Sequence, residues 1–313
     1  MSKKVGIIGA AGTLGSCAAF MIAKEGLADE LVLLPGTREN IVKFHQMDLE
    51  TAITGINDMR VRFGYKEDLS GADVVILAAG APWRRINSRM ELLDDSLPII
   101  VEAARTIRQH CPEAVVITLT NPVDPLNWAL WRLTGLPREQ FLGYSLNDTF
   151  RFRRLVAQAL AIPAPSVDAT VVGEHGPHQV LLFSSVRVNG KPIEIDRETR
   201  ESIFSEIPKI LDRMETLGAG RTTGWTSSIG ISAIVKAVLE DTGEVIPCSA
   251  VLAGEYGRSG LSASLPVSLG RGGVRGFPPL DLASGERQEL EKCFDFLDET
   301  ARSLEPRLAP AAP

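Results

Sequence analysis

The chain of 313 residues is 44% hydrophobic and carries a formal net charge of −6. This length allows a large core in one big or two medium-sized domains. The acidic balance disfavours nucleic acid and an anionic membrane surface as partners, and no apolar stretch approaches the roughly 20 residues of a membrane-spanning helix. The four cysteines lack CxxC spacing, so we expect a cytoplasmic protein with neither a metal nor a disulfide framework.

The first half of the chain alternates between patterns typical of strands and of helices. Apolar, β-branched runs predict strands at 3–9, 29–34, 72–80 and 113–122. Helices are predicted between them at 13–26, 39–52 and 90–110. Such an alternation predicts a parallel sheet with helices on both of its faces.

The pattern changes after about residue 145, and the second half predicts an α+β arrangement. A basic helix at 148–161 leads to a strand that ends at His175, and a hairpin over 180–195 turns at Asn189-Gly190. The remaining predicted elements are helices at 198–217, 225–240 and 285–304 and strand-like runs near 249–254 and 264–277. The tail 306–313, rich in proline and alanine, is expected to be loose.

A glycine-rich turn follows the first predicted strand. Gly9 permits a tight turn, Gly12 lets the backbone approach a pyrophosphate, and Gly15 lets the following helix pack closely on the strand. That helix begins near Thr13 and Leu14 and offers free N–H groups to an anion. A plain strand–turn–helix is the alternative, but the context predicts a Rossmann-type dinucleotide-binding domain over 1–145, followed by a substrate-binding, catalytic domain over 146–313.

The end of the second predicted strand lacks the acidic residue that usually binds the adenosine ribose. The sequence there is Pro35, Gly36, Thr37 and Arg38. Without a carboxylate the repulsion of a 2′-phosphate disappears, and the Arg38 guanidinium is suited to pair with it. The cofactor is therefore predicted to be NAD or NADP, and the missing carboxylate favours NADP, or the use of both, over NAD alone. The alternative is that Arg38 is a solvated loop residue.

The stretch "VVGEHGPHQV" presents His175 at the tip of a strand. A neutral imidazole is suited to accept a proton because its pKa lies near working pH. The alternatives are a structural turn histidine and a zinc pair with His178, for which no third ligand cluster is visible.

Several motifs together resemble the lactate/malate dehydrogenase family over nearly the whole chain. They are "GAAGTLG" after the first strand, "AAGAP…SR" near 78–89, "TNPVD" at 120–124, "NDTFRFR" at 147–153 and "GEHG" at 173–176. The glycine spacing is more similar to the malate branch, or to lactate-dehydrogenase-like malate dehydrogenases, than to the lactate branch. The resemblance implies an oxidoreductase that exchanges a hydride between NAD(P) and a 2-hydroxy acid or its 2-oxo acid.

The resemblance also implies roles for individual residues. His175 matches the family's base, Asp148 the carboxylate that orients it and is expected to raise its pKa, and Arg151 the arginine that grips the substrate carboxylate. Arg89 matches the arginine of a mobile loop. Asn121 matches a polar residue near the substrate oxygen, with a cis bond to Pro122. Cofactor contacts are implied at Ala79, Gly80 and Asn121.

Departures from the family pattern put the substrate in question. Trp83 stands where the family distinguishes lactate from malate, and either Trp83 faces the pocket or a one-residue shift lets Arg84 supply a charge for a dicarboxylate. Trp225 stands near the position of small pocket residues, with packing or an interface as its alternative. Malate with oxaloacetate is the first expectation, and L-lactate or a bulkier 2-hydroxy acid the alternative.

Two further expectations concern assembly and class. The family resemblance implies a homodimer or homotetramer. The rival of another class is a non-catalytic, dinucleotide-binding sensor, which would leave the histidine, aspartate and arginine idle.

Overall fold

The computed structural model describes residues 2–81, 84, 86 and 88–308. The described residues form one mixed sheet of twelve strands. Its first half is parallel, in the order β3-β2-β1-β4-β5-β6. The strands of this half are β1 (Lys4–Ile8), β2 (Glu30–Leu34), β3 (Arg60–Phe63), β4 (Val74–Leu77), β5 (Val115–Thr118) and β6 (Phe141–Gly143).

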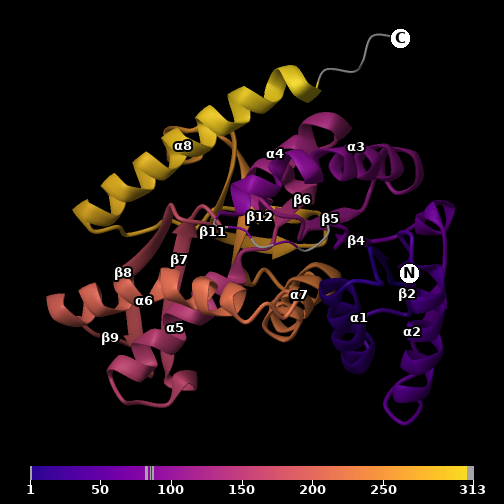
Figure 1. The fold of residues 1–313 in the computed structure, drawn as a ribbon, viewed down its shortest axis with the longest axis horizontal. Coiled ribbons are helices and arrows are strands. Elements are labelled where there is room, and N and C mark those ends of the chain that lie inside the picture. The colour runs from indigo at the N-terminus through magenta and orange to yellow at the C-terminus, as the bar shows by residue number, and fades with distance from the viewer. Residues whose placement is uncertain (1, 82–83, 85, 87, 309–313) are drawn as a thin grey trace.

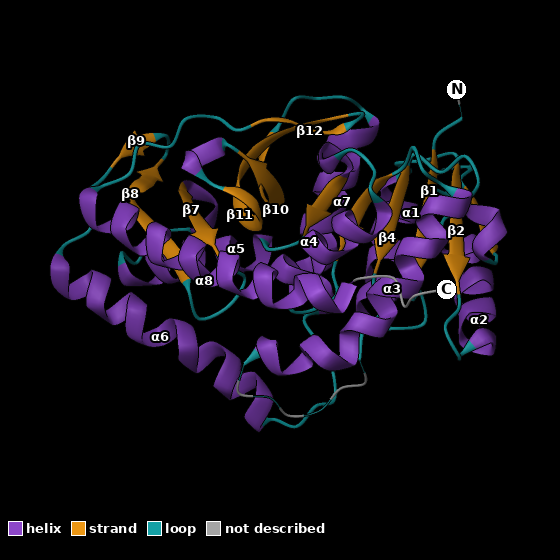
Figure 2. Ribbon diagram, turned by 90° about the horizontal axis from the view of Figure 1, so that it is seen from above, coloured by secondary structure: helices purple, strands orange, loops and turns teal. Residues whose placement is uncertain are grey.

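The second half of the sheet continues from β6 through an antiparallel pair with β10. Its order is β10-β11-β7-β8-β9, with β12 paired to β11. These strands are β7 (Val167–Gly173), β8 (Gln179–Val188), β9 (Lys191–Pro192), β10 (Val245–Ala253), β11 (Ser259–Gly270) and β12 (Gly273–Gly276). Figure 2 shows the two halves side by side, with β1 and β2 at one end and β8 and β9 at the other.

Helices cover both faces of the parallel half because its strands are apolar on both sides. On one face lie α1 (Thr13–Glu25), α2 (Glu39–Ala52) and α7 (Gly224–Leu239). On the other lie α3 (Leu93–His110), α4 (Val123–Thr134) and α8 (Ser284–Leu308), as Figure 1 shows. In the second half α5 (Leu146–Ala159) and α6 (Arg197–Thr216) pack on β7 and β8.

The predicted α/β class is confirmed, and so is the hairpin at Asn189-Gly190. Both turn residues have positive φ, 50° and 76°, as a two-residue hairpin requires. The sequence prediction lacked β3, α4 and β6. It was wrong about the start of the tail, because α8 continues through Pro306 to Leu308. No helix of the described chain is long and apolar enough to cross a bilayer.

The topology fixes where ligands bind. β1 and β4 are neighbours, but the chain leaves β1 toward β2 on one side and reaches β4 on the other. A crevice forms at such a switch point, outside the carboxyl ends of the strands. The residues that follow β1, β4 and β5 therefore gather at one edge of the sheet, where they line a cavity. His175, just beyond β7, lines this cavity too.

Candidate active site

The glycine turn between β1 and α1 has the close approaches that its sequence predicts. Gly9 has a φ of +90°, and a Cβ there would lie 2.5 Å from the backbone nitrogen of Ala79. A Cβ on Gly15 would lie 2.5 Å from the carbonyl oxygen of Gly9, so only glycine lets α1 pack this closely on the turn. Gly12 directly precedes α1 in an extended conformation. The turn thus leaves a backbone cradle at a helix N-terminus, as a pyrophosphate requires.

A cavity of about 740 Å³ opens from this cradle. The predicted cofactor residues that line it are Gly9, Gly12, Thr13, Leu14, Arg38, Ala79, Gly80 and Asn121. Gly15 lies behind the wall and contributes through packing. The described lining residues include five arginines and no aspartate or glutamate, the arginines being Arg38, Arg84, Arg89, Arg151 and Arg221. This cationic cleft fits a ligand with several negative charges, such as a dinucleotide together with an organic acid.

Asn121 brings an unpaired acceptor into the same cleft. Its peptide bond to Pro122 is cis, as the family resemblance implied. The Asn121 carbonyl accepts a hydrogen bond from Ser96 at 2.9 Å, which fixes the backbone. The side-chain Oδ1 is buried and has no hydrogen-bond partner in the described part of the chain. A buried unpaired amide oxygen is costly, and a ligand in the cleft that donates a hydrogen bond would satisfy it.

The structure brings His175, Asp148 and Arg151 together. Asp148 and Arg151 project from the first turns of α5, and His175 follows β7. The ring Nδ1 of His175 lies 2.5 Å from Asp148 Oδ2, while Arg151 Nη1 donates to Asp148 Oδ1 at 3.0 Å. One carboxylate therefore orients both partners. His175 and Arg151 both line the cofactor cavity.

The charges around this group set its protonation. Burial acts to raise the pKa of Asp148, but the facing His175 and the nearby Arg89 and Arg151 outweigh it and lower that pKa to about 2. The ionised carboxylate then accepts a hydrogen bond from the Nδ1–H group. In the neutral ring this leaves Nε2 of His175 without a proton, as the free acceptor. Burial, helped by the two guanidiniums, lowers the pKa of His175, although Asp148 acts to raise it as expected; the net shift is therefore opposite to the contribution of the pair.

Arg84 and Arg89 both form part of the cleft wall. Arg89 begins the short 3-10 helix Arg89–Leu92, and burial lowers its pKa. Its guanidinium has no hydrogen bond to another described residue. Arg84 also lines the cofactor cavity, but it is engaged by the Glu91 carbonyl at 2.6 Å and by Asp95 at 3.2 Å. Trp83, the other candidate for substrate selection, lies outside the described residues.

Trp225 is not brought into the site. Its side chain is 81% exposed at the start of α7, and it lines neither described cavity. This corrects the expectation that Trp225 lines the substrate pocket; the residue beside it in the chain, Gly224, packs against Cys17 and Thr13 of α1 and leaves the indole outside. His178 is also separate from His175: its Nδ1 faces Glu174 at 2.8 Å, and its ring stacks on Phe296.

Other residues of the site escaped the sequence prediction. Asp124 is 1% exposed, and its Oδ2 accepts a hydrogen bond from the backbone N–H of His175 at 2.7 Å. Asn147 donates to the hydroxyl groups of Thr223 at 3.1 Å and Ser227 at 2.9 Å, and all three line the cleft. The only available indication was that Asp124 and Asn147 belong to motifs already quoted for their neighbours.

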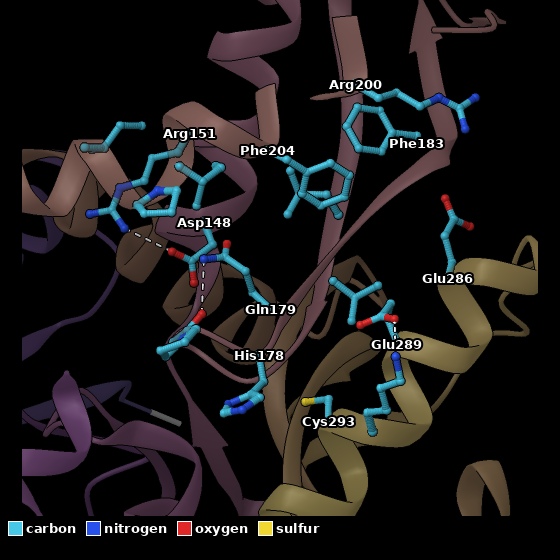
Figure 3. A pocket seen from close by; sticks show the side chains of 18 of the residues that line it. Asp148, Arg151, His178, Gln179, Phe183, Arg200, Phe204, Glu286, Glu289 and Cys293 are labelled. Carbon is cyan, nitrogen blue, oxygen red and sulfur yellow. Dashed lines mark hydrogen bonds and ion pairs between the residues drawn. The ribbon is translucent and has the colours of Figure 1, made fainter. Parts of the chain in front are cut away.

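A second cavity of about 950 Å³ adjoins the first. The two cavities share Ile86, Arg89 and Arg151. The second is bounded by β8, α6 and the start of α8, and its wall includes the apolar Val180, Leu181, Phe183, Phe204 and Ile207. Figure 3 shows Arg151 at one end of this space and Glu286 of α8 at the other.

Comparisons with known proteins agree with this geometry. The profile described as lactate/malate dehydrogenase, NAD binding domain, matches residues 3–143, and the alpha/beta C-terminal domain of the same family matches 146–305. A malate dehydrogenase of Natronomonas pharaonis is 35% identical over 299 residues, covering 95% of this chain and 97% of the relative. An L-lactate dehydrogenase of Thermus aquaticus is 34% identical over 309 residues, covering 96% and 99%.

A solved structure agrees over the same length. The lactate dehydrogenase of Cryptosporidium parvum, complexed with lactic acid and β-nicotinamide adenine dinucleotide, superposes with a TM-score of 0.91 at 28% identity, covering 100% of this chain and 99% of that one. The fold and the cleft thus define a dinucleotide-binding oxidoreductase. The chain belongs to the lactate/malate dehydrogenase family, and its first half is an NAD-binding domain. It is an NAD-dependent 2-hydroxy-acid dehydrogenase of that family.

Proposed function

We propose that His175 is the proton acceptor when the hydroxyl group of a 2-hydroxy acid is oxidised. The observation that supports this role is the shared carboxylate, because Asp148 binds the ring Nδ1 and the Arg151 guanidinium at once. NAD, when bound, supplies the hydride acceptor. His175 Nε2 takes the hydroxyl proton, and Asp148 stabilises the imidazolium that forms. In the reverse direction the same nitrogen returns the proton to the carbonyl oxygen of the 2-oxo acid.

In this proposal Arg151 binds the substrate carboxylate and Arg89 polarises the substrate carbonyl. A planar guanidinium binds a carboxylate through two parallel hydrogen bonds, and Arg151 is held in place for this by Asp148. Arg89, which has no hydrogen bond to another described residue, is available to polarise the substrate carbonyl. In this proposal the chain has two domains. Residues 1–145 bind the cofactor and contribute Arg89 and Asn121 to the site. Residues 146–313 supply His175, Asp148 and Arg151.

Malate with oxaloacetate is the first substrate pair we propose. A dicarboxylate needs a second cation, because an unpaired carboxylate in a closed site is costly. Arg89 and Arg221 line the cleft without an ion pair to another described residue, which leaves cationic charge for a substrate with two negative charges. Malate dehydrogenases of Natronomonas pharaonis and Halobacterium salinarum, at 35% and 36% identity, support the same choice.

A second candidate is another 2-hydroxy acid, either L-lactate or a bulkier one. The second cavity favours the bulkier acid, because its wall includes a group of apolar side chains and Arg151 lies at its junction with the cofactor cleft. An acid whose carboxylate is held by Arg151 would have room for a branched or aromatic side chain there. The charge of Arg84 is already compensated by Asp95, so Arg84 is less available to bind the second carboxylate of a dicarboxylate.

We also propose a homodimer or homotetramer in the reducing cytoplasm. Large apolar side chains lie exposed on the three helices that cover one face of the parallel half, including Phe44 (66%), Met47 (67%) and Trp225 (81%). Exposed apolar area of this kind is typical of an interface. The four cysteines are free, in keeping with that compartment. Light scattering coupled to size exclusion tests the assembly, and a monomer would contradict it.

The substrate proposal is tested by following absorbance at 340 nm with a panel of 2-oxo acids, using NADH and NADPH separately. We expect oxaloacetate to give a kcat/KM about tenfold or more above that of pyruvate or of 4-methyl-2-oxopentanoate. A preference for the branched acid would favour the second candidate instead. No oxidation of NADH or of NADPH with any acid would contradict the dehydrogenase and favour a non-catalytic dinucleotide sensor.

A further inference from the structure

The far end of the cofactor cleft is formed by the loop that follows β2. Gly36, Thr37 and Arg38 line the cavity there. In a dinucleotide-binding domain this is the position of the carboxylate that accepts hydrogen bonds from the adenosine ribose. The described lining residues include no carboxylate at all. The acid closest in sequence is Glu39, which is the first residue of α2 and is paired with Lys43 at 2.5 Å.

The same loop presents unused hydrogen-bond donors. The Arg38 guanidinium and the Thr37 hydroxyl are exposed, and neither has a hydrogen bond or ion pair with another described residue. A Cβ built on Gly36 meets nothing within 4 Å, so the space beside the loop is open. Arg38 is also the N-cap of α2, and its side chain makes no capping bond. The first N–H groups of this helix of 14 residues follow directly after Arg38 in the chain.

We propose that this loop binds the 2′-phosphate of NADP(H), so that the protein binds NADP(H) at least as tightly as NAD(H). A phosphate monoester carries a charge of about −1.5 to −2 at neutral pH and three strong acceptor oxygens. A guanidinium binds such a group through two parallel bonds, and the helix N-terminus favours the same charge. A carboxylate at this position would repel the group, and this chain has none there. The inference rests on the proposed function only in that the ligand is the coenzyme of that reaction.

Binding measured without turnover tests the inference directly. Isothermal titration of the full chain with NADPH and NADH should give a Kd for NADPH that is equal to or lower than that for NADH. Adenosine 2′,5′-bisphosphate should bind about tenfold or more tightly than adenosine 5′-monophosphate, because the two ligands differ only in the phosphate. A higher Kd for NADPH than for NADH would overturn the inference. Failure of the proposed function would appear separately, as the absence of 2-oxo-acid reduction with either coenzyme.

Two variants locate the effect at this loop. Arg38→Gln should raise the Kd for NADPH about tenfold and change that for NADH less than about twofold, since it removes one charge-assisted pair. Gly36→Asp restores a carboxylate where the space is open, and it should raise the NADPH Kd about a hundredfold while lowering that for NADH. Because both residues are exposed, neither change should impair folding.

Arg221→Gln is the matched control. Arg221 also lines the cofactor cavity as an exposed guanidinium without a described partner, but it belongs to the segment before α7. Its removal should leave the ratio of the NADPH and NADH dissociation constants unchanged. If Arg221→Gln altered this ratio as much as Arg38→Gln, the selectivity would come from the overall charge of the cleft, and the assignment to the β2 loop would be wrong.

Discussion

The backbone N–H of His175 donates a hydrogen bond to Asp124 Oδ2 at 2.7 Å, across 51 residues of sequence. Asp124 lies in the first turn of α4, where the helix dipole favours a negative charge. It is buried, and its Oδ1 has no partner in the described part of the chain. Burial raises the pKa of this carboxyl to about 7, with Glu174 and Asp148 adding to the effect. The residue that positions the backbone of His175 is therefore itself close to titration at neutral pH.

Asp124→Asn should remove a pH dependence of stability. The folded pKa of about 7 exceeds the unfolded value of about 3.9. The carboxyl thus contributes stability that is present below about pH 4 and is lost as the pH rises through about 7. The free energy of unfolding of the native protein, relative to the variant, should fall by about 2–3 kcal/mol between pH 5 and pH 8. Urea unfolding at the two pH values measures this, and a constant difference would contradict it.

Asp124→Ala should be more damaging than Asp124→Asn, because it removes the acceptor itself. The His175 N–H would be left buried without a partner, at a cost of about 1–3 kcal/mol. We expect lower stability and a reduced kcat, since the backbone of His175 would no longer be fixed by its hydrogen bond to residue 124. The asparagine variant retains an acceptor oxygen and serves as the control. Equal kcat values in the two variants would show that the bond does not position His175.

His175→Asn should abolish turnover while leaving cofactor binding intact. The proton acceptor contributes on the order of 10²–10⁴-fold to the rate, whereas the glycine turn and the arginines that suit the dinucleotide are unchanged. Steady-state kinetics and NADH titration measure the two effects. His110→Asn, at the end of α3, is the control and should behave as the native protein. Near-native turnover of the His175 variant would remove the central assignment.

The pH dependence of the reaction should report the lowered pKa of His175. Reduction of a 2-oxo acid requires the protonated ring, so its kcat/KM should fall as the pH rises through a midpoint below the ordinary value of about 6.5. Oxidation of the 2-hydroxy acid should rise through the same midpoint. Asp148→Asn removes the charge that opposes this lowering, and the midpoint should move further down. A midpoint that moved up in this variant would contradict the electrostatics of the pair.

Features that depend on a few neighbouring residues could be predicted from the sequence. The glycine turn at Gly9 to Gly15 and the hairpin at Asn189-Gly190 follow from backbone conformations that few other residues adopt. The helix α4 was missed because most of its residues are buried, from Val123 to Leu130 without interruption, so it lacks a polar face. The edge strand β3 is only four residues long and alternates arginine with apolar residues.

Features of the site that depend on distant elements could not be predicted. The bond from His175 to Asp124 joins the segment after β7 to α4, and no local pattern indicates it. The direction of the His175 pKa shift depends on burial and on Arg89, which comes from another part of the chain. The pairing with Asp148 was visible only through a family motif. Sequence motifs thus identified the groups of the site, while their protonation required the packing around them.

Arg151→Lys tests the geometry of substrate binding without removing the charge. A lysine cannot bind Asp148 and a carboxylate through a rigid planar fork, as a guanidinium can. The KM for the 2-oxo acid should rise about tenfold to a hundredfold, equivalent to about 1.4–2.8 kcal/mol. Arg153→Lys is the matched control on the same helix: Arg153 binds the Ala169 carbonyl and Asp168 and lines neither described cavity. An equal rise in KM in both variants would mean that general disturbance of α5, rather than lost carboxylate recognition, is responsible.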